Sequence, residues 1–215
     1  MKEYIPMRTK PVCDPRSAFF DSVADKWDAW HDLPDLALNL DACLAQFGMK
    51  EKEVVLDVGC GTGNLTMALL RRLGLSGRIV AIDISKQMLE QARKKVGDTR
   101  VTWHQASANK IPVGEEKIDR VLCFSVWPHL EDPDTVATEF CRVLRPGGFL
   151  HIWHLISRDK VNHIHQEADP SVHHDRLAPV GETASLLKKN RFSMISMADD
   201  ETRYSITARK EELSS

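Results

Sequence analysis

The sequence predicts an α/β protein in which a doubly wound, parallel sheet is completed by an antiparallel hairpin. Between residues 53 and 154, apolar strand-like segments alternate with helical ones. Such alternation indicates a parallel sheet that is covered by helices on both faces. Near the end of the chain, strand-like runs at 192–197 and 202–208 are separated by a short acidic link. A link this short joins antiparallel strands, so the sheet is expected to end in a hairpin.

Before the first strand, the chain is expected to form an extended arm and a helical cap. Three prolines mark the first 15 residues as extended. Apolar side chains in residues 17–30 fall on one helical face, and a second helix is expected over residues 34–47. We therefore divide the chain into an arm and cap of residues 1–50 and a main domain of residues 51–210.

The elements of the main domain follow from apolar runs and from the residues that bound them. Strands are expected at residues 53–58, 78–83, 101–105, 118–124 and 148–154. Helices are expected at residues 64–73, 86–96 and 134–144, and a short helix at 158–167. Ser85 is the predicted N-cap of the second of these helices, because a serine side chain can bond the free N–H groups of the first turn.

Composition narrows the possible partners and compartments. The net charge is −2, whereas proteins that bind nucleic acid through its phosphates usually carry a basic surplus. The apolar stretch at residues 149–156 is too short to span a bilayer, and residues 1–10 lack the apolar run of a signal peptide. The five cysteines are scattered and form no C-x-x-C pair. We therefore expect a cytoplasmic protein with reduced thiols, no membrane span and no nucleic-acid partner.

A glycine-rich turn follows the first strand and carries the strongest chemical signal. Gly59, Gly61 and Gly63 alternate with other residues just before a helix. Glycines allow a sharp bend and a close ligand approach, and the helix start offers free N–H groups and a partial positive charge. Asp83 ends the second strand, 20 residues after Gly63, where a carboxylate can accept both hydroxyls of a ribose. Together these features predict a nucleoside site.

The glycine spacing and a nearby acid indicate which nucleoside binds. The dinucleotide fingerprint is G-x-G-x-x-G, whereas this turn reads G-x-G-x-G, with Asp57 two residues before the first glycine. That carboxylate would repel a pyrophosphate and attract an ammonium group. A cationic aminoacyl nucleoside is therefore favoured over NAD. The alternatives are a nicotinamide-dependent oxidoreductase, a non-catalytic regulator that keeps the nucleoside pocket, and a turn without a ligand.

Three segments resemble one enzyme family. L-D-V-G-C-G-T-G at 56–63 resembles motif I of class I S-adenosylmethionine-dependent methyltransferases, especially the small-molecule branch of ubiquinone/menaquinone biosynthesis methyltransferases (methyltransferase type 11-like). F-D-S-V-A-D-K-W-D at 20–28 is similar to the opening of that branch, and R-V-L-R-P-G-G at 142–148 to a turn before its fifth strand. The resemblance covers about residues 17–210. It implies a Rossmann-like, doubly wound, seven-stranded sheet whose last strand is antiparallel.

The resemblance also implies a cofactor and a reaction. The protein is expected to bind S-adenosylmethionine, to transfer its methyl group to a small-molecule acceptor by in-line displacement, and to release S-adenosylhomocysteine. Asp57 is expected to hold the aminoacyl end, Asp83 the ribose, and Ile84 with Met88 the adenine. The complete set of expected cofactor contacts is Asp57, Gly59, Cys60, Gly61, Gly63, Asp83, Ile84, Met88, Ser107, Ala108 and Phe124.

One segment departs from the pattern of the family. Relatives often carry G-D-A-x-x-L-P after the third strand, and the aspartate accepts a hydrogen bond from the adenine amino group. This chain has A-S-A-N-K-I-P at 106–112, so that Ser107 replaces the acid. A hydroxyl accepts a weaker hydrogen bond than a carboxylate does. Asn109 could take over the role, or the Ala108 backbone could hold the adenine.

A second group of residues points to the acceptor. Six of the nine histidines lie between residues 151 and 174, and the histidine-rich insert, residues 157–181, is long enough to form a lid or binding loop. His154 lies at the carboxyl end of its strand, where ligands bind in such sheets, and is the candidate general base if the acceptor atom carries a proton. The expected substrate contacts are Trp27, Ser125, His154, His165 and His174.

Other interpretations of these histidines stay open. They could be solvated or bonded only for structure, since neutral imidazole is common in polar loops. A divalent-metal site at His165, His174 and Asp175 is a further possibility, although no close ligand spacing supports it. After the fourth strand, Phe124 and Ser125 are favoured as ligand contacts over His129, which is interpreted as a loop cap.

Overall fold

Strands and helices alternate along most of the chain. In the computed structural model, which describes residues 14–212, the strands are β1 (Val54–Val58), β2 (Arg78–Asp83), β3 (Val101–Gln105), β4 (Ile118–Phe124), β5 (Leu144–His154), β6 (Phe192–Asp199) and β7 (Tyr204–Lys210). The α-helices are α1 (Pro15–Val23), α2 (Leu33–Gln46), α3 (Asn64–Arg72), α4 (Lys86–Lys95), α5 (Pro133–Val143), α6 (Arg158–Glu167) and α7 (Val180–Lys189). Two short 3-10 helices are η1 (Trp27–Trp30) and η2 (Trp127–His129). The predicted arm falls mostly on residues 1–13, outside the described residues.

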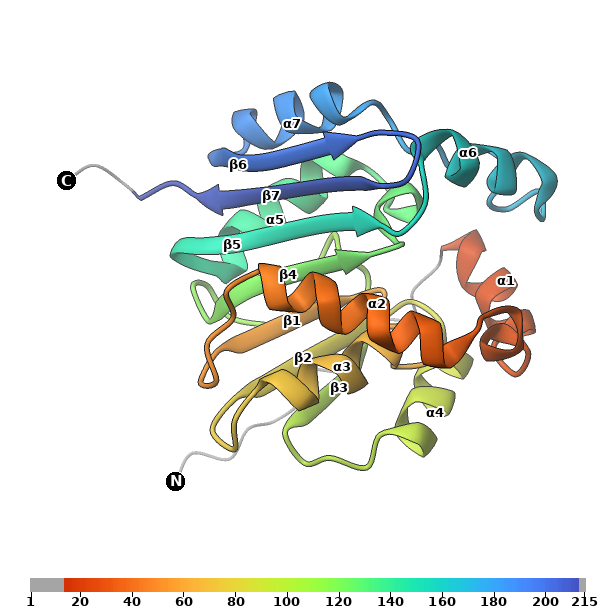
Figure 1. Ribbon diagram of the computed structural model, residues 1–215, viewed down its shortest axis with the longest axis horizontal. Coiled ribbons are helices and arrows are strands. Elements are labelled where there is room, and N and C mark those ends of the chain that lie inside the picture. Colours follow the sequence, from red (N-terminus) through yellow and green to blue (C-terminus); the bar gives the residue numbers. More distant parts are fainter. Residues whose placement is uncertain (1–13, 213–215) are drawn as a thin grey trace.

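The seven strands form one mixed sheet in the order β3-β2-β1-β4-β5-β7-β6 (Figure 1). Neighbouring strands from β3 to β5 run parallel. By contrast, β7 is antiparallel to both β5 and β6. The predicted seven-stranded, doubly wound sheet with an antiparallel last strand is therefore confirmed. Its order reverses between β1 and β4, and ligands bind at such switch points in open α/β sheets.

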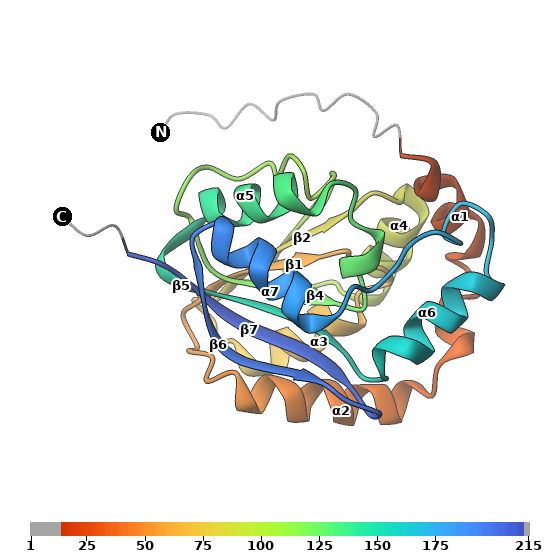
Figure 2. The same ribbon diagram turned by 90° about the horizontal axis from the view of Figure 1, so that it is seen from above.

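Helices cover both faces of the sheet, which explains why its central strands are almost continuously apolar. On one face, Leu40 of α2, Leu65 of α3 and Leu89 of α4 pack in one core cluster with apolar strand residues. On the other face, Phe140 of α5 and Leu187 of α7 belong to a second cluster. Figures 1 and 2 show α2 and α3 on one side of the sheet and α5 and α7 on the other.

Most predicted boundaries agree with the structure to within one or two residues, and the predicted N-cap is confirmed. The Ser85 hydroxyl accepts a hydrogen bond from the Met88 nitrogen at 3.0 Å. β5 begins four residues earlier than expected, because the turn at residues 145–148 is included in the strand. Helix α7 was not among the expected elements. Its apolar signal is weak, because only two of its buried residues, Ala184 and Leu187, are apolar.

The amino-terminal cap differs from the prediction. Residues 17–30 form two pieces, because α1 ends at Val23 and η1 begins at Trp27. The break between these pieces still leaves the rings of Phe20 and Trp27 in contact, with centroids 5.9 Å apart. Helix α2 belongs to the helical layer beside α3 rather than to a lid. The part that covers the strand ends therefore consists of α1 and η1, and we call these two helices the cap.

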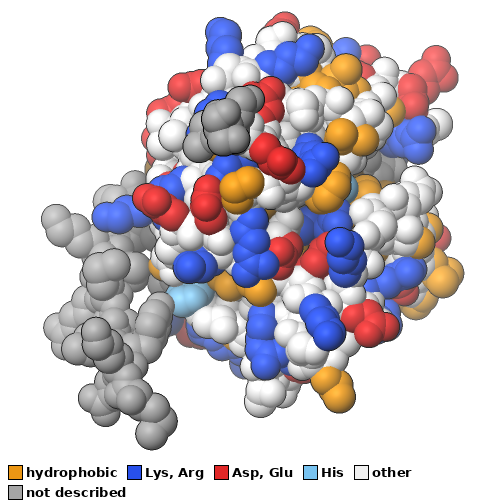
Figure 3. All heavy atoms as spheres, turned by 90° about the vertical axis from the view of Figure 1, so that its left-hand side faces the viewer, with side chains coloured by type: hydrophobic (Ala, Val, Ile, Leu, Met, Phe, Trp, Pro, Cys, Tyr) orange, Lys and Arg blue, Asp and Glu red, His pale blue; other side chains and the backbone are white. Residues whose placement is uncertain are grey.

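The two ends of the sheet differ in character. At the carboxyl ends of the parallel strands, α1 and α6 lie close together in both ribbon views. The opposite end, seen in Figure 3, carries basic and acidic side chains that are interspersed across the visible face.

Among residues 14–212, no helix has both the length and the apolar character needed to cross a bilayer.

Candidate active site

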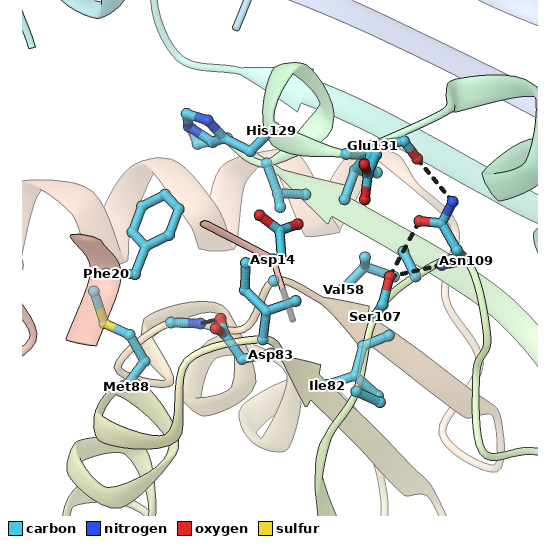
Figure 4. Close-up of a pocket in the computed structure, with 18 of the residues that line it drawn as sticks. Asp14, Phe20, Val58, Ile82, Asp83, Met88, Ser107, Asn109, His129 and Glu131 are labelled. Atoms are coloured by element: carbon cyan, nitrogen blue, oxygen red, sulfur yellow. Dashed lines mark hydrogen bonds between the residues drawn. The ribbon is translucent and has the colours of Figure 1, made fainter. Parts of the chain in front are cut away.

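A cavity opens where the carboxyl ends of β1, β2 and β4 meet the cap (Figure 4). In this view His129 and Phe20 lie on one side of the cavity, and Ser107 and Asn109 on the other. The lining residues are Asp14, Phe20, Trp27, Val58, Gly59, Gly61, Ile82, Asp83, Ile84, Met88, Ala106, Ser107, Ala108, Asn109, Ser125, Val126, His129, Leu130 and Glu131. The cavity therefore lies at the switch point of the sheet.

The glycine turn forms one wall of this cavity. Gly59 and Gly61 both have positive φ, at 62° and 52°. A Cβ on Gly59 would lie 2.2 Å from Cγ2 of Val126, so no side chain fits there. A Cβ on Gly61 would meet nothing within 4 Å, although this residue lines the cavity. The missing side chain of Gly61 therefore leaves space in which a ligand can approach the backbone.

Asp83 stands beside this turn at the end of β2. Its Oδ2 accepts a hydrogen bond from the Gly61 nitrogen at 2.9 Å, and its Oδ1 accepts one from the Ser85 nitrogen at 2.8 Å. Burial raises the pKa of Asp83 to about 6, although these two backbone bonds act in the opposite direction. Because a carboxylate oxygen has two lone pairs, each oxygen can still accept a ligand hydroxyl. This geometry suits the expected ribose contact.

Asp57 lies beneath the turn and does not line the cavity. Only 1% of its surface is exposed, and Thr66 of α3 donates a hydrogen bond to Oδ2 at 2.6 Å. Burial is the largest cause that raises its pKa to about 7, and the nearby Asp83 charge acts in the same direction. Oδ1 is buried and has no partner within the described residues. The expected contact between Asp57 and an aminoacyl group stays a prediction.

The structure brings together most, but not all, of the predicted cofactor contacts. Those that line the cavity are Gly59, Gly61, Asp83, Ile84, Met88, Ser107 and Ala108. Those that do not are Asp57, Cys60, Gly63 and Phe124. Cys60 is buried in the core on the α2 side, and the Phe124 ring packs 5.2 Å from that of Trp153. Alternation accounts for Cys60, which stands between the lining residues Gly59 and Gly61, but not for Asp57 or Gly63.

Ser107 and Asn109, the two candidates for the adenine contact, both line the cavity and bond to each other. The Ser107 hydroxyl donates to Oδ1 of Asn109 at 3.1 Å and accepts from the Asn109 nitrogen at 3.2 Å. Nδ2 of Asn109 donates to the Glu131 carbonyl at 2.9 Å. These bonds fix the loop after β3 against the loop after β4 (Figure 4).

The cap is tied to the cavity wall by two aspartates whose roles the sequence did not indicate. Asp21 of α1 accepts a hydrogen bond from the Ser85 hydroxyl at 2.6 Å. Asp28 of η1 accepts one from the Thr62 hydroxyl at 2.6 Å and forms an ion pair with Lys95 at 2.6 Å. The segment at residues 20–28 thus places two aromatic rings over the cavity and fastens them with two carboxylates. Only the family resemblance had singled out these aspartates.

His154 lies at the carboxyl end of β5, as expected, but it does not line the cavity. Its exposed fraction is 4%, and burial lowers its pKa to about 3. Nε2 of His154 is buried without a partner in the described residues. A ring in this position is shielded from a ligand in the cavity, so the structure gives its expected role as a base no support.

His129, interpreted from the sequence as a loop cap, lines the cavity instead. Its Nδ1 lies 2.7 Å from Oδ2 of Asp175, which comes from the histidine-rich insert. Arg16 of α1 approaches Oδ1 of the same carboxylate at 3.3 Å. The His165 ring lies 4.6 Å from that of His129, and its Nδ1 donates to the Asp175 carbonyl at 2.7 Å. The cap, η2 and the insert therefore meet at one point.

The other residues that were predicted to contact the substrate or a metal ion are not gathered in one place. Trp27 and Ser125 line the cavity, whereas His165 lies behind His129. His174 is exposed, and its ring contacts His173 at 5.2 Å. Within residues 14–212, no group of three or more histidine, cysteine, aspartate or glutamate side chains is arranged to hold a metal ion. The predicted set of His165, His174 and Asp175 is not such a group.

A comparison with known protein families agrees with the fold and with the position of the cavity. Residues 55–148 match the family described as "Methyltransferase domain". This segment begins in β1 and contains the glycine turn, Asp83 and the loop with Ser107. This part of the chain is therefore similar to a methyltransferase domain, which is the class that the resemblance of the glycine turn implied.

Known proteins resemble this chain in sequence and in fold. The ubiquinone/menaquinone biosynthesis C-methyltransferase of Hahella chejuensis is 33% identical over 138 residues, which cover 61% of this chain and 55% of that protein. The protein of the same name from Escherichia coli O1:K1 is 31% identical over 140 residues, with 61% and 55% covered. This chain thus spans about half the length of these curated relatives. A SAM-dependent methyltransferase from Aquifex aeolicus superposes with a TM-score of 0.72 at 24% identity, over 88% of this chain and 97% of that one.

Proposed function

We propose that the protein transfers a methyl group from S-adenosylmethionine to a small-molecule acceptor. The observation that carries this proposal is the cradle at the glycine turn. There the open space at Gly61 adjoins the carboxylate of Asp83, so that the backbone can approach a ligand beside an acceptor for its hydroxyls. The named activity of the relatives, C-methyl transfer, supports the reaction class.

Residues of this chain fit the parts of the cofactor. Asp83 would accept the ribose hydroxyls, and the backbone at Gly59 and Gly61 would border the aminoacyl end. Ile84 and Met88 supply apolar surface for the adenine, because both line the cavity next to Asp83. When bound, S-adenosylmethionine would supply a methyl group that is attached to a positively charged sulfur. The sulfur is the leaving group when a nucleophile attacks the methyl carbon in line. The protein then contributes mainly orientation and the exclusion of water.

The cap completes the acceptor side of the proposed site. Phe20 and Trp27 line the cavity from the cap, and the Phe20 ring meets that of His129 edge-on at 5.3 Å. Aromatic walls of this kind bind small, flat molecules with apolar surface. Free thiols at Cys43, Cys60, Cys123 and Cys141 favour a cytoplasmic location, where thiols stay reduced.

Calorimetry with S-adenosylhomocysteine tests the cofactor assignment. We expect the wild type to bind this compound and the Asp83→Ala variant to lose about 3 kcal/mol, roughly 100-fold in Kd, because two charge-assisted hydrogen bonds disappear. The Asp159→Ala variant, which changes a side chain that is 84% exposed, is the control and should bind as the wild type does. Absence of binding by the wild type, or equal binding by Asp83→Ala, would contradict the assignment.

Turnover is a separate measurement. Formation of S-adenosylhomocysteine from S-adenosylmethionine should be followed with a panel of hydroquinones, catechols, amines and thiols. Release of product with at least one acceptor is expected. Tight cofactor binding without turnover across the panel would instead favour a non-catalytic regulator, and quenching of NADH fluorescence would favour an oxidoreductase.

A further inference from the structure

We propose that His129, oriented by Asp175, accepts a proton from the methyl acceptor. This inference rests on the proposed methyl transfer and adds to it a base that is assembled from three separate segments. The proposal also restricts the acceptor, because a base is needed only when the atom that is methylated carries a proton at neutral pH. Hydroxyl groups and acidic carbon centres meet this condition, whereas halides and thioethers do not.

The hydrogen bond to Asp175 determines which nitrogen of His129 is basic. A carboxylate can only accept, so the contact of 2.7 Å between Nδ1 and Oδ2 of Asp175 places the proton of the neutral ring on Nδ1. Nε2 is then left with its lone pair, and no hydrogen-bond partner for it exists among residues 14–212. Since His129 lines the cavity, this nitrogen is the one that we assign to the acceptor. The arrangement of base and orienting carboxylate is the one that general-base catalysis requires.

The pair of His129 and Asp175 belongs to a connected set of charged side chains. Asp14, Arg16 and Asp175 form a connected chain, in which Nε of Arg16 donates to Oδ1 of Asp14 at 2.9 Å and Nη1 donates to Oδ1 of Asp175 at 3.3 Å. The formal charges of Asp14, Arg16, Asp175 and His129 add up to −1 when the His129 ring is neutral and to 0 when it is protonated. Their side chains are only 9–14% exposed, so solvent screens these interactions weakly.

Other ionisable groups also face His129. His165 of α6 lies in ring contact with it, and His154 of β5 is near enough for its charge to interact with both rings. Asp83 at the end of β2 also interacts with the charge of His129. Burial lowers the pKa of both His154 and His165, which favours the neutral form of these two rings.

The proton transfer balances the methyl transfer. At a hydroxyl acceptor, a lone pair of the oxygen would form the bond to the methyl carbon, and the electron pair of the O–H bond would stay on oxygen as its proton passes to Nε2 of His129. At an acidic carbon, the electron pair of the C–H bond would form the new bond once its proton has passed to Nε2. In both cases the electron pair of the carbon–sulfur bond would stay on the sulfur of the cofactor. The resulting imidazolium remains paired with Asp175, and solvent later takes up the proton.

In this proposal, the histidine-rich insert holds Asp175 in position beside His129. Asp175 follows α6 in sequence, and its position is fixed by the bond from His165 to its carbonyl. In the same insert, Nδ2 of Asn162 donates to the Leu177 carbonyl at 3.1 Å, and Oδ1 of Asn162 accepts from the Leu177 nitrogen at 2.8 Å. The chain between α6 and α7 is thus held at Asp175 and at Leu177. His165 and Asn162 are positioning residues for this carboxylate.

Nitrogen NMR of the histidine rings tests the arrangement without any acceptor. Protein labelled with ¹⁵N-histidine and saturated with S-adenosylhomocysteine should show a His129 ring that is protonated on Nδ1 and unprotonated on Nε2 at neutral pH. Free histidine favours the opposite tautomer. The signal is assigned by its loss in His129→Gln, and Asp175→Ala should shift the ring toward the Nε2–H form. A wild-type His129 ring with its proton on Nε2 would overturn the proposal, even if Asp175→Ala failed to fold.

Kinetics with any acceptor that the panel yields provide the second readout. We expect His129→Gln to lower kcat by roughly 100-fold or more, since general bases contribute about 10²–10⁴-fold, with KM for S-adenosylmethionine within about twofold. The control is His163→Gln, because this ring on α6 is 66% exposed and lies outside the site. An unchanged kcat for His129→Gln would overturn the proposal.

Calorimetry separates the two levels of inference. If His129→Gln binds S-adenosylhomocysteine as the wild type does but loses turnover, both the cofactor site and the base are supported. If the wild type binds the cofactor product and the NMR tautomer is wrong, only the base fails. If the wild type binds no cofactor product at all, the proposed function itself fails.

Discussion

At the scale of single residues, Gly61 shows how an absent side chain creates a site. Its positive φ and the open space around its Cβ position favour glycine for two separate reasons, backbone strain and ligand access. Gly48 shares the first reason only, since its φ is 61° and it lies far from the cavity. We expect Gly61→Ala and Gly48→Ala to lower the free energy of unfolding by a similar ~1–2 kcal/mol. Only Gly61→Ala should weaken S-adenosylhomocysteine binding, by roughly tenfold or more in calorimetry, because a methyl group would occupy ligand space. Equal binding by both variants would contradict this role.

At the scale of elements, the cap depends on polar anchors more than on apolar burial. No residue of α1 or η1 is fully buried, so the hydrogen bonds and the ion pair of Asp28 fasten η1 to the glycine turn and to α4. We expect Asp28→Ala to raise amide hydrogen exchange across residues 15–31 and to weaken S-adenosylhomocysteine binding severalfold, because a loosened cap exposes the cavity. Asp25→Ala, which changes an exposed carboxylate between the two cap helices, is the control. Unchanged exchange in Asp28→Ala would show that the aromatic contacts alone hold the cap.

At the scale of the whole molecule, a buried ion pair stabilises the end of the sheet opposite the cavity. Arg120 of β4 donates to both carboxylate oxygens of Glu53 at 2.8 and 2.9 Å, and its side chain is only 2% exposed. We expect Glu53→Ala to lower the free energy of unfolding in urea by about 3–5 kcal/mol, because it leaves a buried guanidinium unpaired. Arg145→Ala breaks a half-exposed pair with Asp119 and should cost below about 1 kcal/mol. Similar losses in the two variants would contradict the buried pair's importance.

The sequence by itself determined the fold class, the nucleoside cradle and its acid. These features are local, because the periodicity of apolar residues and a glycine turn depend on neighbours a few positions apart. Asp83 could be placed because parallel strands bring their carboxyl ends to one edge, where the end of β2 lies beside the turn after β1. The family resemblance, rather than these local signals, singled out Ile84, Met88 and Ser107, and all three line the cavity.

Only the tertiary structure decided which side chains line the cavity. Asp57 and His154 are located where the sequence suggested, yet both are buried behind the cavity wall, because burial depends on packing that no single segment reveals. His129 and Asp175 are 46 residues apart, and Arg16 and Asp175 are 159 apart. Their contacts arise because the folded sheet brings α1, η2 and the insert to one edge. The cradle at Gly61 was therefore predictable from the sequence, whereas the proposed base beside it required the folded chain.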